Sequence, residues 1–207
     1  MLIASCSSSD NSSDGGKKND SELTSEERSK QNVEHAMELI DNAVNCYFTG
    51  AGMTMSRYYN PYTGSRSDEV GSVWMYTSSI EAVNAVLHAL KEQKEKGITE
   101  LYDANYNRYK ELLSKLYSNA EYYLGTYTLT SFTQTKEWTV YGVNRGREKG
   151  TAEVEGVMNV YDDQMWLIRE CLDAYKATSE KLYLEKAEYL TEYVLDGWDC
   201  TDRKSAV

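Results

Sequence analysis

The stretch Val160-Tyr161-Asp162-Asp163-Gln164-Met165-Trp166 places two adjacent carboxylates at the start of a strongly apolar helix that continues through Tyr175. Apolar side chains recur at helical spacing along it, as expected for a helix that is buried on most of its circumference. They are Met165, Ile168, Leu172 and Tyr175, with Trp166, Leu167 and Cys171 widening the stripe. The sequence on both sides is predicted to form further helices that support this one, so the chain is organised around it.

The two aspartates have a structural interpretation beside any catalytic one. Asn159, or Asp162 itself, can accept hydrogen bonds from the unpaired N–H groups of the first helical turn. The positive end of the helix dipole also stabilises carboxylates at this position. On spacing alone the capping role is the commoner one, and the neighbouring motifs must decide between the two interpretations.

Four further helices are predicted from apolar residues that recur every three or four positions. They span about residues 26–48, 73–96, 101–124 and 181–196. Residues 49–71 are predicted to form a loop because they contain several glycines and Asn60-Pro61, which favour turns. Residues 125–157 are predicted as a long loop or a small hairpin, because they contain two short β-like runs. A loop of this length usually carries function.

A faint internal repeat relates the helix that follows residue 73 to the helix that follows residue 160. When the two segments are aligned, Tyr76 matches Tyr161 and Leu87 matches Leu172. Both segments have an entry loop, an apolar helix, a short turn and an amphipathic helix, which is how toroids of helical hairpins repeat. Both apolar helices would then be inner helices, with their N-termini converging at one end.

A series of motifs along the second half of the chain points to a family. The motifs are Tyr161-Asp162-Asp163-Gln164-Met165-Trp166, Leu172-Asp173-Ala174-Tyr175, Ala177-Thr178, Tyr183-Leu184-Glu185-Lys186-Ala187 and Gly197-Trp198-Asp199. In this order they resemble glycoside hydrolase family 76, clearly over about residues 159–199 and more faintly from about Val33. The resemblance implies an all-α fold, an (α/α)6 toroid of antiparallel hairpins, and an endo-acting α-1,6-mannanase that needs no cofactor and cleaves α-mannan.

The resemblance also assigns catalytic roles, with Asp162 as the nucleophile and Asp163 as the acid/base. A helix N-terminus favours an ionised nucleophile, and a second carboxylate beside that anion is favoured in its protonated form. Retaining enzymes hold the two carboxyl groups about 5–5.5 Å apart, which neighbouring side chains on a helix reach readily. The spacing therefore favours retention of configuration.

Aromatic residues near the pair are the candidates for substrate binding. Trp74 and Tyr161 stand at the entrances of the two inner helices, and we expect both to contact sugar, although Trp74 suits a core position equally well. Trp166 follows the aspartates by one turn and is expected to pack beneath the site. Trp138 and Trp198 are expected to pack in the core.

Composition excludes several other classes of function. The net charge of −11 argues against binding to a phosphate backbone, so no nucleic acid is expected as a partner. The four cysteines show no CxxC and no Cys/His spacing, so no metal site is expected. No glycine-rich phosphate loop and no HExxH motif is present.

The N-terminus predicts a cell-envelope location. Ile3-Ala4-Ser5-Cys6 resembles the end of a bacterial lipoprotein signal, with Cys6 as the lipidated residue, although the basic and most of the apolar part are missing. Residues 1–25 are therefore interpreted as a truncated signal and a disordered tether rich in Ser and Asp. The expected location is the outer membrane, lipid-anchored and surface-exposed; a differently processed signal would give a periplasmic or secreted protein.

The number of helices limits what this chain is expected to do. An (α/α)6 barrel has twelve helices, and residues 26–207 supply about five, so we expect a partial domain that corresponds to the N-terminal half of such an enzyme. Its uncovered inner helices would expose apolar surface and favour self-association. Weak or absent hydrolysis is expected from such a half. The alternatives are a non-catalytic, lipid-anchored surface protein that binds glycan, and an inactive remnant.

Overall fold

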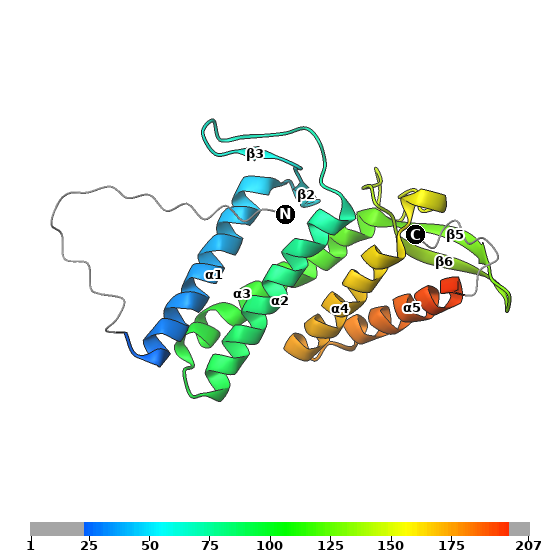
Figure 1. Ribbon diagram of the computed structural model, residues 1–207. Helices are drawn as coiled ribbons and strands as arrows, with labels where there is room; N and C mark the ends of the chain where they lie inside the picture. Colours follow the sequence, from blue (N-terminus) through cyan, green and yellow to red (C-terminus); the bar gives the residue numbers. More distant parts are fainter. Residues whose placement is uncertain (1–22, 199–207) are drawn as a thin grey trace.

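Helices make up most of the part of the chain that the computed structural model describes, residues 23–198 (Figure 1). The helices are α1 (Ser25–Tyr47), α2 (Val73–Glu95), α3 (Glu100–Ala120), α4 (Tyr161–Thr178) and α5 (Lys181–Trp198), with 3-10 turns η2 (Glu121–Tyr123) and η3 (Gly156–Met158). The five predicted helices are confirmed, and their observed ends lie within a few residues of the predicted ones. The expected lipidation site Cys6 lies outside the described residues.

Local sequence explains where these helices begin and end. Thr24 accepts a hydrogen bond from the backbone N–H of Glu27, and the Glu27 carboxylate accepts one from the backbone of Thr24, which makes a capping box at the start of α1. Ser72 caps α2 through its hydroxyl. Ser179 ends α4 in the left-handed conformation, with φ of 62°, and so allows the tight turn into α5.

Three small antiparallel sheets correct the all-α expectation. The pairs are β1 (Phe48–Thr49) with β2 (Thr54–Met55), β3 (Tyr59–Asn60) with β4 (Ser65–Arg66), and β5 (Leu124–Thr130) with β6 (Thr135–Tyr141). The last pair is the hairpin that was one of two predictions for residues 125–157. The first four strands were not predicted: they lie in the predicted loop 49–71, except that β1 begins at Phe48, the last residue of the first predicted helix. Two-residue strands are too short to show an alternating pattern.

The helices α2 and α4 lie side by side with their N-termini at the same end (Figure 1). A ring nitrogen of His88 is hydrogen-bonded to the carbonyl oxygen of Asp173, and Lys91 donates to the carbonyl oxygen of Lys176. Each of these pairs is 85 positions apart, which is also the offset of the internal repeat. The faint sequence repeat therefore coincides with a register in space.

The remaining helices flank this central pair. α1 and α3 pack against α2, and α5 packs against α4. The ring centroids of Tyr117 on α3 and Tyr183 on α5 lie 4.7 Å apart. This contact connects the helix pair α2–α3 with the helix pair α4–α5. α2 and α4 are thus the central pair of the five described helices. The described helices form an open array, and a closed toroid is not seen among them.

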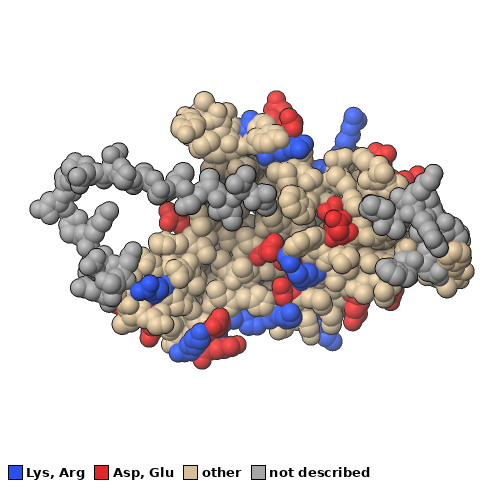
Figure 2. Space-filling model, viewed as in Figure 1, with Lys and Arg blue, Asp and Glu red and all other residues tan. Residues whose placement is uncertain are grey.

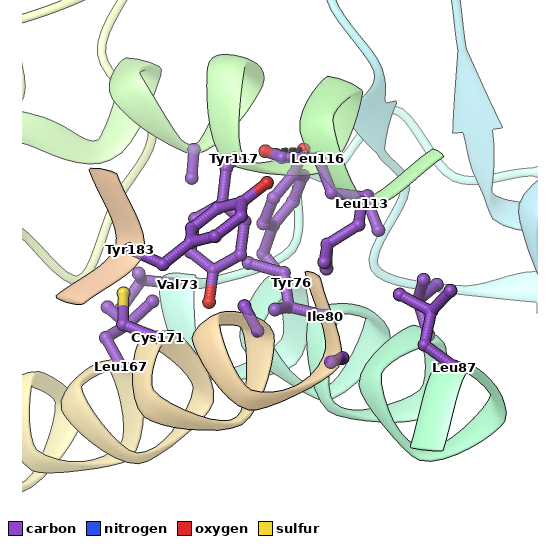
Figure 3. Close-up of a cluster of buried hydrophobic side chains, with 14 of the residues drawn as sticks. Val73, Tyr76, Ile80, Leu87, Leu113, Leu116, Tyr117, Leu167, Cys171 and Tyr183 are labelled. Atoms are coloured by element: carbon purple, nitrogen blue, oxygen red, sulfur yellow. Dashed lines mark hydrogen bonds between the residues drawn. The ribbon is translucent and has the colours of Figure 1, made fainter. Parts of the chain in front are cut away.

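The core lies between α2, α3, α4 and α5 (Figure 3). Ile80, Leu113 and Cys171 are fully buried there, so Cys171 is the small buried hydrophobe that its helix face predicts. Several tyrosines of the core hydrogen-bond their hydroxyl groups to backbone carbonyls: Tyr76 donates to the carbonyl oxygen of Leu116, the dashed contact in Figure 3, and Tyr123 donates to that of Gly71. Buried tyrosine needs such a partner because an unpaired hydroxyl is costly in an apolar core.

The hairpin β5–β6 is fastened to the end of α5. Trp138 on β6 is 1% exposed, which confirms its predicted packing role, and its indole N–H donates to Asp196 at 3.0 Å. The hydroxyl of Ser131 in the hairpin turn donates to the same carboxylate at 2.8 Å. Tyr189 accepts a further bond from the backbone N–H of Thr139. These bonds hold the hairpin against α5.

Candidate active site

The paired aspartates occupy the first turn of α4. The N-cap residue is Val160, whose side chain makes no capping hydrogen bond. Asn159 does not cap the helix either, because its amide oxygen accepts a bond from Gln164 and its nitrogen bonds to tyrosine hydroxyls. Asp162 Oδ1 accepts one hydrogen bond, from the backbone N–H of Asp163 at 2.9 Å. The capping interpretation is therefore limited to this single contact.

The two carboxyl groups have different surroundings. Asp162 is exposed, whereas Asp163 is half-buried. Burial, together with the charge of Asp162, raises the pKa of Asp163 to about 6. A carboxyl group with such a pKa is protonated in a large fraction of molecules in mildly acidic solution, as a general acid must be.

A buried polar residue anchors the turn that carries the pair. Gln164 is fully buried, and its side-chain amide both donates to the backbone carbonyl of Tyr141 at 2.7 Å and accepts from the backbone N–H of Tyr141 at 3.1 Å. It therefore pairs with the end of β6 as another strand would. Because Gln164 directly follows the aspartates, the position of the carboxylates depends on the hairpin.

Tyr161 packs under the site. It is half-buried, and its ring is stacked on that of Tyr193 with centroids 5.3 Å apart. The hydroxyl of Tyr193 is in turn hydrogen-bonded to Tyr127 and Asn159. Tyr161, predicted to contact substrate, thus connects the aspartate turn to α5 and the hairpin, and its contact with sugar stays a prediction.

An open groove lies beside the pair, between the N-terminal parts of α2 and α4. It has a volume of about 420 Å³ and is lined by Met55, Trp74, Met75, Thr77, Ser78, Glu81 and Trp166. Trp74 is 54% exposed, so the structure favours the surface position over the core position for this residue. Trp166 is 39% exposed and does not pack beneath the site as expected. The aspartates themselves do not line this groove.

The groove and the aspartates are nonetheless neighbours. Trp166 follows Asp162 by four positions and Asp163 by three, so all three share one side of α4 within about one turn. Along the α2–α4 register, Thr77 in the groove lies opposite the first turn of α4. The groove therefore leads along the helices toward the carboxylates.

A charged cluster holds the wall of the groove. The guanidinium of Arg169 lies 3.9 Å from the ring centroid of Trp166. It forms ion pairs with Glu81 on α2 at 2.9 Å and with the buried Glu170 at 3.0 Å. Sequence reasoning missed Trp166, Arg169 and Glu81 as site residues, because their proximity depends on the pairing of two helices that are far apart in the chain.

Metal-binding clusters, membrane-spanning helices and basic stripes are further features that bear on other kinds of site. No group of His, Cys, Asp or Glu side chains within residues 23–198 could hold a metal ion. None of the described helices is long and apolar enough to cross a membrane. Acidic and basic side chains are interspersed over the face in Figure 2, without a basic stripe on that face. The sequence matches no known protein-family model and no curated protein.

Proposed function

We propose that this chain is a glycoside hydrolase that cleaves α-1,6-mannosidic linkages of mannan by a retaining mechanism. The observation that carries the proposal is the pair Asp162 and Asp163 at the start of α4, where the pKa of Asp163 is raised to about 6 beside an exposed second carboxyl group. One carboxyl group is thus suited to donate a proton and the other to attack as an anion, the division of labour that glycosidases use.

In the proposed reaction, Asp163 gives its proton to the glycosidic oxygen while Asp162 attacks the anomeric carbon. The bond to the leaving sugar breaks, and a glycosyl ester forms on Asp162. Asp163, now ionised, takes a proton from water as the water attacks the anomeric carbon and releases Asp162. Two inversions at one carbon give retention of configuration. The step requires no metal and no cofactor.

We further propose that α2 and α4 are inner helices of an (α/α) toroid. The support is their parallel packing at the offset of the internal repeat, and the flanking positions of α1, α3 and α5. In such an arrangement the N-termini of inner helices gather at one end, where the aspartates and Trp74 are found. The exposed Met165 and Leu172 on α4 would then face further helices or another copy of the chain.

The remaining proposals about context rest on the N-terminal motif and on the family resemblance. We propose a cell-envelope protein, anchored to the outer membrane through a lipid on Cys6 and acting on α-mannan at the surface. Metabolic labelling of the expressed chain with a radioactive fatty acid tests the anchor: label should appear in the native sequence and vanish in Cys6→Ser. Equal labelling of both would overturn the anchor without touching the catalytic proposal.

The catalytic proposal is tested by measuring reducing ends released from linear α-1,6-mannan. The native chain should release them slowly but measurably, and Asp162→Asn and Asp163→Asn should each lower that rate roughly 10²-fold or more. Asp173→Asn, at the other end of the same helix, is the matched control and should keep full activity. Full activity in either variant of the pair would overturn the assignment. Affinity for mannan without turnover would instead support a glycan-binding protein.

A further inference from the structure

Two exposed tryptophans from different helices meet at one groove. Trp74 on α2 and Trp166 on α4 are 54% and 39% exposed, and both line the same space of about 420 Å³. By contrast, Trp138 is 1% exposed. Large aromatic rings gathered at a concave surface mark binding sites, because leaving them in water is costly unless a ligand covers them.

The ring of Trp166 is held in place before any ligand arrives. Arg169 stacks on it at 3.9 Å from the centroid, and the ion pairs of Arg169 with Glu81 and Glu170 fix the guanidinium from two sides. Glu170 is itself fixed, since Asn84 on α2 donates to its Oε2 at 3.0 Å. A ring that is already ordered loses little entropy on binding. The cluster therefore presents Trp166 as a rigid platform.

The charges around the groove favour a neutral ligand. The cation of Arg169 is matched by two carboxylates, so it has no unpaired charge to offer to an anion. The protein as a whole carries −11 charges, and Asp162 lies one turn from Trp166. Anions are repelled by this field, and Glu81, the one carboxylate among the residues that line the groove, is already engaged by Arg169.

The polar groups of the groove can meet hydroxyl groups. Thr77 is buried and uses its hydroxyl within α2, whereas the exposed Ser78 donates its hydroxyl hydrogen to the carbonyl oxygen of Met75. The oxygen of the Ser78 hydroxyl thereby keeps lone pairs that can accept a hydrogen bond from a ligand. A wall of this kind combines aromatic faces with a few acceptors. That combination suits a sugar ring, which has an apolar face and a rim of hydroxyl donors.

We propose that Trp74 and Trp166 form an aromatic clamp that binds a neutral pyranose ring one turn away from the aspartates. The volume of the groove lies within the range of small-molecule sites. The identity of the ligand rests on the proposed function, because the linkage to be cleaved must lie at Asp162 and Asp163. The clamp then holds a sugar unit next to the scissile bond and sets how the chain enters the site.

Binding can be measured apart from catalysis. The probe is α-1,6-linked mannotetraose, titrated by calorimetry into the full chain carrying Asp163→Asn. Trp74→Ala and Trp166→Ala in that background should each weaken the affinity about tenfold or more, the scale of a lost aromatic contact. Trp74→Tyr and Trp166→Tyr should keep most of the affinity. Phe132→Ala removes an exposed aromatic residue outside the groove and should change nothing.

Each outcome has a distinct meaning. Unchanged affinity in both alanine variants, with thermal unfolding as in the parent, would overturn the clamp even if the native chain hydrolyses mannan. Affinity that depends on both tryptophans in a chain without hydrolytic activity would support the clamp and overturn the hydrolase. If the alanine variants unfold, Trp74→Leu and Trp166→Leu decide, because both keep an apolar side chain but lose the aromatic face: weakened binding in these folded variants supports the clamp, and full affinity overturns it. Sedimentation that shows a dimer dispersed by Trp74→Ala would also overturn it, since a second copy would then occupy the groove.

Discussion

The ring of Tyr161 lies in the space that a side chain at residue 197 would occupy. A Cβ atom on Gly197 would overlap the Tyr161 ring, so the last turn of α5 can approach the first turn of α4 only because this residue is glycine. The contact joins two motifs of the family resemblance, the Tyr161-Asp162-Asp163 turn and Gly197 of Gly-Trp-Asp. It gives both a common physical reason, which is to place the aspartate turn against α5.

Gly197→Ala should therefore damage the site and the fold together. Overpacking of this kind typically costs about 1–3 kcal/mol in the free energy of unfolding. Urea unfolding should show this loss, and hydrolysis should fall further than the loss of folded protein explains. Gly71→Ala is the control, because a Cβ there meets Met55 only at ordinary contact distances of 3.4 Å and more. Equal stability of the two variants would contradict the close approach.

The raised pKa of Asp163 predicts that replacing this residue stabilises the folded protein, by an amount that depends on pH. The folded state holds the proton more tightly than the unfolded chain, whose value is near 3.8, so ionisation opposes folding as the pH rises through about 6. Asp163→Asn should thus raise the melting temperature at pH 7.5, and the gain should fade as the pH falls toward 4. Asp173→Asn serves as the control. A gain that is equal at both pH values would contradict a shifted carboxyl group.

The bonds to Asp196 predict that the hairpin depends on a single carboxylate. Burial favours its protonation, but hydrogen bonds from Ser131, Gln134 and Trp138 outweigh burial and hold the pKa of Asp196 below its usual value. Stability from this group is present above the unfolded pKa and is lost as the pH falls. Asp196→Ala leaves the buried indole N–H of Trp138 unpaired, which should cost about 1–3 kcal/mol.

Tryptophan fluorescence during unfolding checks this prediction, because Trp138 reports on the hairpin. The variant should lose stability most at pH 7 and approach the native chain at low pH. Asp103→Ala, on the first turn of α3, is a control that should change little. A stability difference that grows as the pH falls would contradict the assigned sign.

Asn84 and Glu170 predict a specific link between the two central helices. Asn84 Nδ2 donates both to the backbone carbonyl of Glu170 at 2.9 Å and to its carboxylate at 3.0 Å. Asn84→Ala should cost about 1–3 kcal/mol because it leaves buried acceptors unsatisfied. Asn119→Ala, which removes only a bond within α3, should cost less. Chemical denaturation of both variants makes the comparison, and an equal loss would contradict the link.

The sequence predicted the helices because their apolar periodicity is local information. The burial of Cys171 follows from its place on the apolar face of α4, whereas the burial of Trp138 rests on contacts with α5 that lie far away in the chain. The short strands before α2 carry no such period, so they were missed. The position of Trp166 could not be predicted either, since its exposure depends on α2, which supplies Trp74 and Glu81 across the groove. Gln164 left a usable signal, a polar residue on an apolar helix face.

The most direct test of the central claim is the anomeric form of the first sugar released from an α-1,6-linked mannotetraose, followed by proton NMR before mutarotation. The account predicts that the α-anomer appears first, because Asp162 attacks and is then displaced by water that Asp163 activates. It also predicts that neither anomer appears with Asp162→Asn. Initial release of the β-anomer, or cleavage that survives Asp162→Asn, would contradict it.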